Sequence, residues 1–143
     1  GVTTTQAIAY GARAENPEPS QIITALDSKR DDIYLQAFSA DGSDLGEVEA
    51  VASGAVNGWL SARNLAGPIT LIGDAAERVL EILDPDHASH IVRGQASAVP
   101  DAAHVAALAA ERIFSGAPLQ ETRPFYLRPP DATIPKNGGR LRD

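Results

Sequence analysis

The amino-acid sequence predicts an α/β domain in which a mixed β-sheet is layered with helices. Two neighbouring segments, residues 21–27 and 32–40, carry the near-continuous or alternating apolar residues of buried strands. From residue 53 onward the apolar period lengthens from two to about 3.6, the repeat of an α-helix. Meandering strands followed by alternating helices and strands require a sheet with helices packed on it.

The first half of the chain is expected to contain one helix and three strands. In order, these are a helix at 3–14 and strands at 21–27, 32–40 and 44–52. Thr3 to Thr5 can cap the helix, and a proline-rich stretch at 16–20 ends it. An Asp-Gly pair at 41–42 favours a hairpin, which makes the third strand an edge strand, and the second is expected to be covered on both faces.

The second half of the chain alternates helices and short strands. Helices are expected at 53–64 and 74–83, strands at 69–73 and 89–92, and a last helix between Pro100 and Gly116. Ser53 can cap the first of these helices, Pro100 suits the first turn of the last one, and Gly116 suits its C-terminal end. The last helix carries a narrow stripe of small apolar residues that permits close packing: Ala102, Val105, Ala106, Ala109 and Ile113.

The element order β-β-β-α-β-α-(β)-α, after an N-terminal helix, is that of a ribonuclease-H-like unit. We divide the chain into a helix and linker at 1–20, this unit at 21–120, and a proline-rich tail at 121–143 whose basic end is expected to be flexible. The sequence contains no methionine, which favours a fragment that lacks the N-terminal part of a longer protein.

Composition narrows the possible functions. The chain has no cysteine, which excludes disulfides, zinc–thiolate sites and thiol catalysis, and fits a cytoplasmic protein. No apolar run approaches the roughly 18 residues that span a bilayer, so no membrane partner is expected. The net charge is −7, and an acidic surface repels phosphate backbones, which disfavours independent binding to nucleic acid.

Two carboxylates are candidates for metal-dependent chemistry. Asp27 ends the first expected strand and Asp74 follows the fourth, and nucleases of the ribonuclease-H type gather such groups around metal ions. The helix expected at 53–64 supplies no third acid. A carboxylate-dependent metal hydrolase or peptidase using Asp27 and Asp74 is therefore kept as the alternative function.

Other catalytic or metal-binding patterns are weak. Asp84, Asp86, His87 and His90 could bind a metal, but the two histidines are three residues apart rather than the four of a helical metallopeptidase motif. His104 stands alone on the last helix and is expected to be a packed or surface histidine. No nucleophile elbow is present, and nothing in the sequence pairs a serine with a histidine.

The stretch Leu-Ile-Gly-Asp-Ala-Ala at 71–76 resembles a nucleotide loop, in which a glycine joins a strand to a helix N-terminus. Asp74 stands at the helix start, where its carboxylate can accept the helix N–H groups and repels an incoming phosphate. We therefore expect Gly73 and Asp74 to form a degenerate loop that caps itself and binds no cofactor.

Four stretches resemble the TsaB (YeaZ) family of glycoprotease-like proteins. They are Gly-Val-Thr-Thr-Thr-Gln-Ala-Ile-Ala-Tyr-Gly-Ala at 1–12 and the segments 25–38, 71–76 and 124–136. The last contains an aromatic-Leu-Arg-Pro-Pro-Asp-Ala run and is the most specific. The resemblance implies two ribonuclease-H-like halves, as in the actin-like ATPase superfamily, with this chain as essentially the second half.

The resemblance also implies a function. Members of this family are non-catalytic partners of a TsaD-like subunit and a TsaE-like ATPase, without a metal or cofactor of their own. The complex forms N6-threonylcarbamoyladenosine next to the anticodon of tRNAs that read A-starting codons. This implies contact with tRNA only through the complex, and a homodimer is also compatible with the resemblance.

The tail is the remaining candidate site. Its stiff apolar segment is expected to dock on the domain or to contact a partner, and it comprises Pro124, Phe125, Tyr126, Leu127, Arg128, Pro129, Pro130 and Asp131. Prolines reduce the entropy that the unfolded tail loses, so docking costs less. The sequence leaves open whether the segment seals the core or serves as an interface.

Overall fold

The computed structural model describes residues 1–16, 18, 20–63, 65, 67–116, 118, 126 and 127. Its elements, in chain order, are α1 (Thr4–Glu15), β1 (Gln21–Asp27), β2 (Asp32–Phe38), β3 (Glu49–Ala52), the short 3-10 helix η1 (Ser53–Ala55), α2 (Val56–Ser61), β4 (Ile69–Ile72), α3 (Ala76–Leu80), α4 (Pro85–Ala88), β5 (Ile91–Arg93) and α5 (Ala102–Phe114). The predicted order of strands and helices is confirmed, with α4 as an addition.

The five strands form one mixed sheet in the order β3-β2-β1-β4-β5. β1 and β2 pair antiparallel, as do β2 and β3, whereas β4 pairs parallel with both β1 and β5. An antiparallel meander followed by parallel strands is the arrangement expected of a ribonuclease-H-like unit. The parallel pair β1 and β4 brings the carboxyl ends of both strands to the same edge of the sheet.

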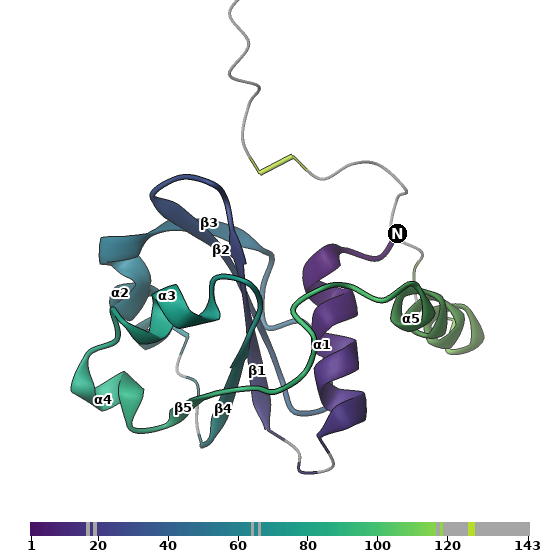
Figure 1. Ribbon diagram of the computed structural model, residues 1–143. Coiled ribbons are helices and arrows are strands. Elements are labelled where there is room, and N and C mark those ends of the chain that lie inside the picture. The colour runs from purple at the N-terminus through teal and green to yellow at the C-terminus, as the bar shows by residue number, and fades with distance from the viewer. Residues whose placement is uncertain are drawn as a thin grey trace, which may run out of the picture.

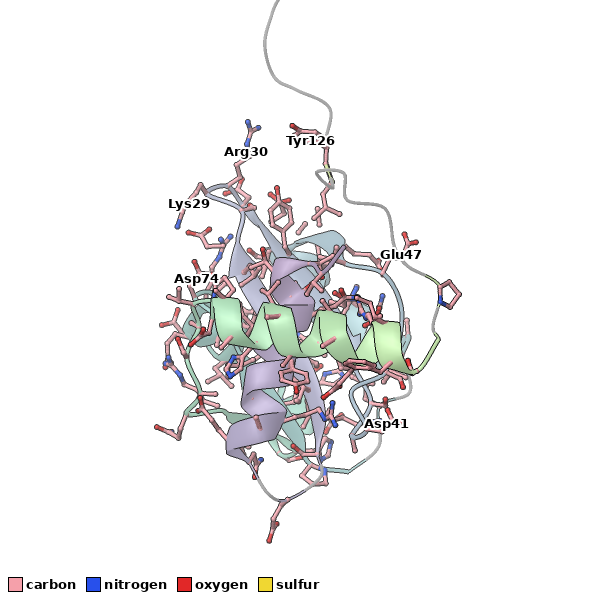
Figure 2. The ribbon with its side chains drawn as sticks, turned by 90° about the vertical axis from the view of Figure 1, so that its right-hand side faces the viewer. Lys29, Arg30, Asp41, Glu47, Asp74 and Tyr126 are labelled. Atoms are coloured by element: carbon pink, nitrogen blue, oxygen red, sulfur yellow. The ribbon has the colours of Figure 1, made fainter. Side chains whose placement is uncertain are left out.

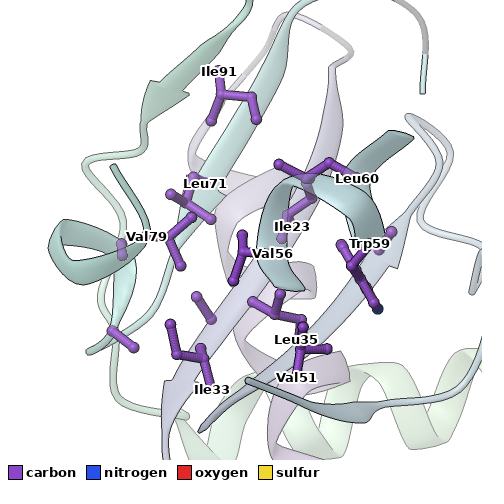
Figure 3. Packing of buried hydrophobic residues seen from close by; sticks show 14 of the residues in the cluster. Ile23, Ile33, Leu35, Val51, Val56, Trp59, Leu60, Leu71, Val79 and Ile91 are labelled. Atoms are coloured by element: carbon purple, nitrogen blue, oxygen red, sulfur yellow. The ribbon is translucent and has the colours of Figure 1, made fainter. Parts of the chain in front are cut away.

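Helices cover both faces of the sheet (Figure 1). On one face α2 and α3 pack over a large apolar cluster that includes Ile23, Leu35 and Leu71, which Figure 3 shows at close range. On the other face α1 packs over a smaller cluster that contains Ile8, Ile22 and Phe38. The prediction that the second strand is covered on both faces is confirmed.

α1 begins at a capping box. The Thr3 hydroxyl accepts the backbone N–H of Gln6 at 3.2 Å, and the Gln6 side chain accepts the backbone N–H of Thr3 at 3.1 Å. Two N–H groups that the first turn leaves unpaired are thereby satisfied. This helix also carries a buried polar contact to the sheet, in which the Thr5 hydroxyl donates to Gln36 Oε1 at 2.5 Å.

Several predicted elements are shorter in the structure. The third strand forms only over Glu49–Ala52, with Asp44 as an isolated bridge to Phe38. The helix expected at 53–64 is η1 followed by α2, and Ser53 does not cap it. The Ser53 hydroxyl instead donates to the carbonyl of Asp31 at 2.6 Å, because the β1–β2 turn lies beside it.

The last helix differs from its prediction in its start and its buried face. Asp101 caps it by accepting the N–H of Ala103, so Pro100 lies outside the helix, whereas Gly116 follows its end with φ +70° as predicted. The stripe that would permit close packing is not used for it in this structure: Ala102, Val105, Ala106 and Ile113 are exposed, and Ala109 is half-buried. α5 lies outside α1 rather than on the sheet (Figure 1), so its contact face is set by α1.

Polar side chains join α5 to α1 and to the chain before it. The Tyr10 hydroxyl donates to Glu111 at 2.7 Å, and Arg112 donates to the Gly1 carbonyl at 3.0 Å. His104 packs against Tyr10, with ring centroids 5.9 Å apart, and lies so close to Gly11 that a Cβ there would be 2.6 Å from its ring nitrogen. Of the two environments expected for His104, packed or surface, the structure shows the packed one. None of the described helices is long and apolar enough to cross a membrane.

Candidate functional site

The candidate site lies at the carboxyl ends of β1 and β4. Asp27 is the last residue of β1, and Gly73 and Asp74 follow β4 directly. Because these strands are parallel neighbours, the two aspartates meet: the backbone N–H of Asp27 donates to Asp74 Oδ1 at 2.8 Å. Lys29, on the β1–β2 turn, lies at the same edge of the molecule as Asp74 (Figure 2).

Gly73 allows the loop after β4 to lie directly against β1. Its φ is +124°, and an added Cβ would stand 2.0 Å from the carbonyl oxygen of Ala25. The N–H of Ala75 donates to that same oxygen at 3.1 Å, and the N–H of Ala76 donates to the Gly73 carbonyl at 3.2 Å. Both N–H groups therefore bind carbonyls of the chain, whereas a nucleotide loop directs such groups at phosphate.

Asp74 has a different partner from the one predicted. α3 begins at Ala76 behind Ala75, without a capping side chain, so the expectation that Asp74 caps this helix is wrong. The left-handed turn at Gly73 directs the carboxylate back over the end of β1, where it accepts the N–H of Asp27. The loop still carries a negative charge at its tip, because Asp74 is exposed.

Two cations of the chain neutralise Asp27. Its Oδ2 lies 2.8 Å from Lys29 Nζ, its Oδ1 accepts the backbone N–H of Lys29 at 2.8 Å, and Arg78 is 3.8 Å from Oδ1. The Lys29 hydrogen bond lowers the pKa of Asp27, and the same contact raises the pKa of Lys29. A divalent ion at this carboxylate would have to displace the ammonium group and compete with the guanidinium.

Arg78 fixes the β1–β2 turn beside this pair. It donates to the carbonyls of Arg30 at 2.9 Å and Asp31 at 2.6 Å, and to the Ser53 hydroxyl at 2.7 Å. Lys29 in the same turn adopts φ +62°, a left-handed conformation that is uncommon without glycine. α3, the turn and the start of η1 are thus joined by one side chain, which makes the edge of the site a preformed surface.

The candidate metal residues at 84–90 do not converge. Asp84 caps α4, and its Oδ1 accepts both the backbone N–H of His87 at 2.9 Å and the ring Nδ1–H at 2.8 Å. The backbone hydrogen bond is the largest cause that lowers the pKa of Asp84. His90 faces Ser89 instead, with Nδ1 2.8 Å from the hydroxyl. Within the described ranges, no three histidine, aspartate or glutamate side chains come close enough to share a metal ion.

The structure does pair a serine with a histidine, which corrects the sequence analysis. Ser61, at the end of α2, lies with its hydroxyl 3.3 Å from His87 Nε2. The two residues are 26 positions apart, with β4 and α3 between them, so the contact depends on how these elements pack. No local motif marks it, which is why the sequence did not indicate it.

Little of the candidate tail is described. The Tyr126 side chain is 82% exposed (Figure 2), and Leu127 is half-buried. Pro124, Phe125, Arg128, Pro129, Pro130 and Asp131 lie outside the described residues. The docking or interface role expected for this segment therefore stays a prediction.

Solved structures of other proteins share this fold, among them two YeaZ-like ones. One is a crystal structure of a protein with similarity to peptidase YeaZ from Pseudomonas aeruginosa, with TM-score 0.63, 19% identity, and coverage of 89% of this chain and 57% of that one. The other is YeaZ from Pseudomonas aeruginosa, with TM-score 0.53, 20% identity, and coverage of 80% and 51%. No protein-family model and no curated protein sequence matches the chain.

These similarities confirm the predicted ribonuclease-H-like fold and show that YeaZ-like proteins share it. The identities of 19% and 20% establish a shared fold. The chain spans little more than half the length of either related structure.

Proposed function

We propose that this chain acts as part of a TsaB (YeaZ)-like, non-catalytic partner subunit of a TsaD-containing complex. That complex forms N6-threonylcarbamoyladenosine next to the anticodon of tRNAs that read A-starting codons. The proposal is supported by the fold shared with YeaZ and by the resemblance of four sequence stretches to that family. The protein meets a TsaD-like subunit and a TsaE-like ATPase, and reaches tRNA only through them.

The loop after β4 carries the non-catalytic part of the proposal. In a nucleotide-binding relative of this fold, a glycine loop at a helix N-terminus presents N–H groups to phosphate. Here the N–H groups of Ala75 and Ala76 bind the carbonyls of Ala25 and Gly73, and the Asp74 carboxylate stands at the tip. A phosphate would meet an occupied set of donors and a negative charge, so nucleotide and metal belong to the partner subunit.

The alternative is a carboxylate-dependent metal hydrolase or peptidase, and one observation favours it: Asp27 and Asp74 lie together at the strand ends. Their surroundings argue against it. Lys29 and Arg78 already compensate Asp27, and a metal ion would have to replace these cations. The partner-subunit function therefore explains the geometry better.

The decisive experiment uses the complete protein that contains this chain. It is co-expressed with tagged TsaD-like and TsaE-like subunits in cells that have no other source of this protein. The modified nucleoside in bulk tRNA is then measured by mass spectrometry. We expect co-purification with the TsaD-like subunit, and loss of the nucleoside when the protein is absent. A protein that neither co-purifies nor restores the nucleoside would refute the proposal.

A double variant separates the two functions. Asp27→Asn together with Asp74→Asn removes both negative charges. The amide oxygen introduced at position 74 can still accept the backbone N–H at position 27. A partner subunit should keep restoring the modified nucleoside with these changes. A hydrolase that uses both carboxylates should lose its activity, and its manganese binding by calorimetry should disappear with them.

A further inference from the structure

A serine, a histidine and an aspartate form a hydrogen-bonded series on the α2–α4 side of the sheet, away from the site at the carboxyl ends of β1 and β4. Asp84 Oδ1 lies 2.8 Å from His87 Nδ1, and His87 Nε2 lies 3.3 Å from Ser61 Oγ. An aspartate that orients an imidazole, which in turn accepts a serine proton, is the arrangement that activates a hydroxyl nucleophile. The 3.3 Å contact is within the looser range of such pairs before substrate binds.

Asp84 is placed to set the tautomer of His87. Its carboxylate only accepts hydrogen bonds, so His87 must carry a proton on Nδ1 to make the 2.8 Å contact. The backbone N–H of His87 donates to the same oxygen, which fixes the position of the carboxylate. In the neutral imidazole, Nε2 is then the acceptor and faces Ser61.

Ser61 has a second acceptor for its proton. Its hydroxyl lies 3.0 Å from the Asn57 carbonyl one turn earlier in the helix, so the single proton can point to Asn57 or to His87. Only the arrangement that points to His87 produces a nucleophile. Both acceptors are within reach of the Ser61 oxygen as it stands. Rotation of the hydroxyl hydrogen, without a backbone movement, therefore converts one arrangement into the other.

A surface cavity of about 220 Å³ adjoins this series. Its apolar lining residues are Leu60, Leu65 and Ile69, and its polar ones include Asp86, His87 and His90. Ser61 also lines it, so the hydroxyl lies beside a space that suits a short acyl chain. The chemical class that fits is a small activated ester with an apolar acyl group.

We propose that Ser61 accepts acyl groups from small activated esters, with His87 as general base and Asp84 as the residue that positions it. The Ser61 oxygen attacks the carbonyl carbon as its proton passes to His87 Nε2. The bond from that carbon to the leaving oxygen then breaks, the leaving group departs as an alkoxide or phenoxide, and His87 releases its proton to it or to water. The product is an ester on Ser61, which water can hydrolyse by the same proton path.

The rate is expected to be low for a structural reason. An efficient acyl transfer needs N–H donors aimed at the developing oxyanion, and removal of one such donor slows known enzymes by about 10²–10³. Beside Ser61, the N–H of Ala62 binds Gly58 and that of Arg63 binds Leu60. The missing donors slow both acylation and hydrolysis, but the alkyl ester on Ser61 is less activated than the ester that forms it. We therefore expect the acyl group to accumulate on Ser61 at about one per chain rather than to turn over rapidly.

The test uses 4-nitrophenyl acetate and the complete chain. Nitrophenolate release is followed by absorbance, and the acetyl group is located by peptide mass spectrometry, which separates Ser61 from the amines of Gly1, Lys29 and Lys136. Ser61→Ala should abolish acetylation of that peptide. His87→Gln should slow it by about 10²-fold or more, which is the usual contribution of a general base.

Two variants distinguish chemistry from folding. Asp84→Asn keeps a capping side chain for α4 but loses the charge that orients His87, so acetylation should slow while the urea midpoint changes little. Ser89→Ala removes a serine that faces His90 rather than His87, and should leave the rate unchanged. Acetylation of Ser61 at an equal rate in His87→Gln, or acetylation confined to the amines, would overturn the proposal.

Discussion

Replacement of Gly73 by alanine is predicted to displace the loop after β4 from β1. The residue has φ +124°, where a side chain is strained, and a Cβ would stand 2.0 Å from the Ala25 carbonyl oxygen. The oxygen belongs to β1, which is paired on both sides at the centre of the sheet, so we expect the loop to shift rather than the strand. The shift would break the 3.1 Å hydrogen bond from the Ala75 N–H to Ala25 and weaken the contact between Asp74 and Asp27.

The expected loss combines backbone strain with about one hydrogen bond. A residue forced into such a backbone conformation costs about 1–3 kcal/mol, and a lost hydrogen bond about 0.5–1.5 kcal/mol. We therefore expect the free energy of unfolding to fall by about 2–4 kcal/mol. At about 3 °C per kcal/mol for a chain of this length, the melting temperature should drop by roughly 6–12 °C.

Gly58→Ala is the matched control. Gly58 lies inside α2, has no atom within 4 Å of an added Cβ and has no positive φ, so alanine should raise stability by up to about 1 kcal/mol. Both variants are measured by urea unfolding followed by circular dichroism. If Gly73→Ala remained within about 0.5 kcal/mol of the parent chain, below the cost of a single strained residue, the close approach of the loop to β1 would be refuted.

Three further predictions concern the turns and the tail. Arg78→Met should lower the free energy of unfolding by about 1–2 kcal/mol, because two carbonyls of the β1–β2 turn and the Ser53 hydroxyl lose their donor. Amide hydrogen exchange in that turn should increase. Unchanged exchange would contradict the inference that Arg78 fixes the turn. The Ser39 hydroxyl, with Ser43, lowers the pKa of Asp41 to about 2, so the turn's contribution to stability is present above the ordinary carboxyl pKa of 3.8 and is lost as the pH falls toward 2. Titration by NMR should show this shift in the parent chain and a smaller one in Ser39→Ala. Truncation after residue 123 should leave the melting temperature nearly unchanged, since Tyr126 is 82% exposed, and should weaken recruitment of the TsaE-like ATPase. A large drop in melting temperature would indicate instead that the tail packs on the core.

The strand-end loop gives the proposed function a physical basis. A loop that lies against β1 and is held there by hydrogen bonds to its own chain has lost the open donors of a phosphate site. A further contact makes this edge rigid, because Arg78 joins α3 to the β1–β2 turn. A rigid, charged and preformed edge is suited to contact with another protein subunit.

Local signals predicted most of the fold because they act between neighbouring residues. The helix cap near Thr3, the strand at Gln21–Asp27 and the helix end before Gly116 were all predicted from spacing or residue type. Each depends on backbone propensities and hydrogen bonds that span a few residues. Their placement in one mixed sheet followed from the element order alone.

The buried face of α5 could not be predicted in this way. Its apolar stripe suggested close packing, yet the face that meets α1 carries His104, Leu108 and Glu111. Amphipathic spacing reports which side of a helix is apolar, but not which element lies against it. α1 already fills the face of the sheet, so α5 is left as an outer layer.

The sequence by itself therefore determined most of the elements, their order and the ribonuclease-H-like class, because periodicity, caps and turns act over a few residues. Only the tertiary structure decided that Asp74 binds the N–H of Asp27, and that Ser61 meets His87. Hydrogen-bond partners far apart in the chain depend on how strands register and helices pack. That geometry is a collective result of the core, and no single stretch of residues encodes it.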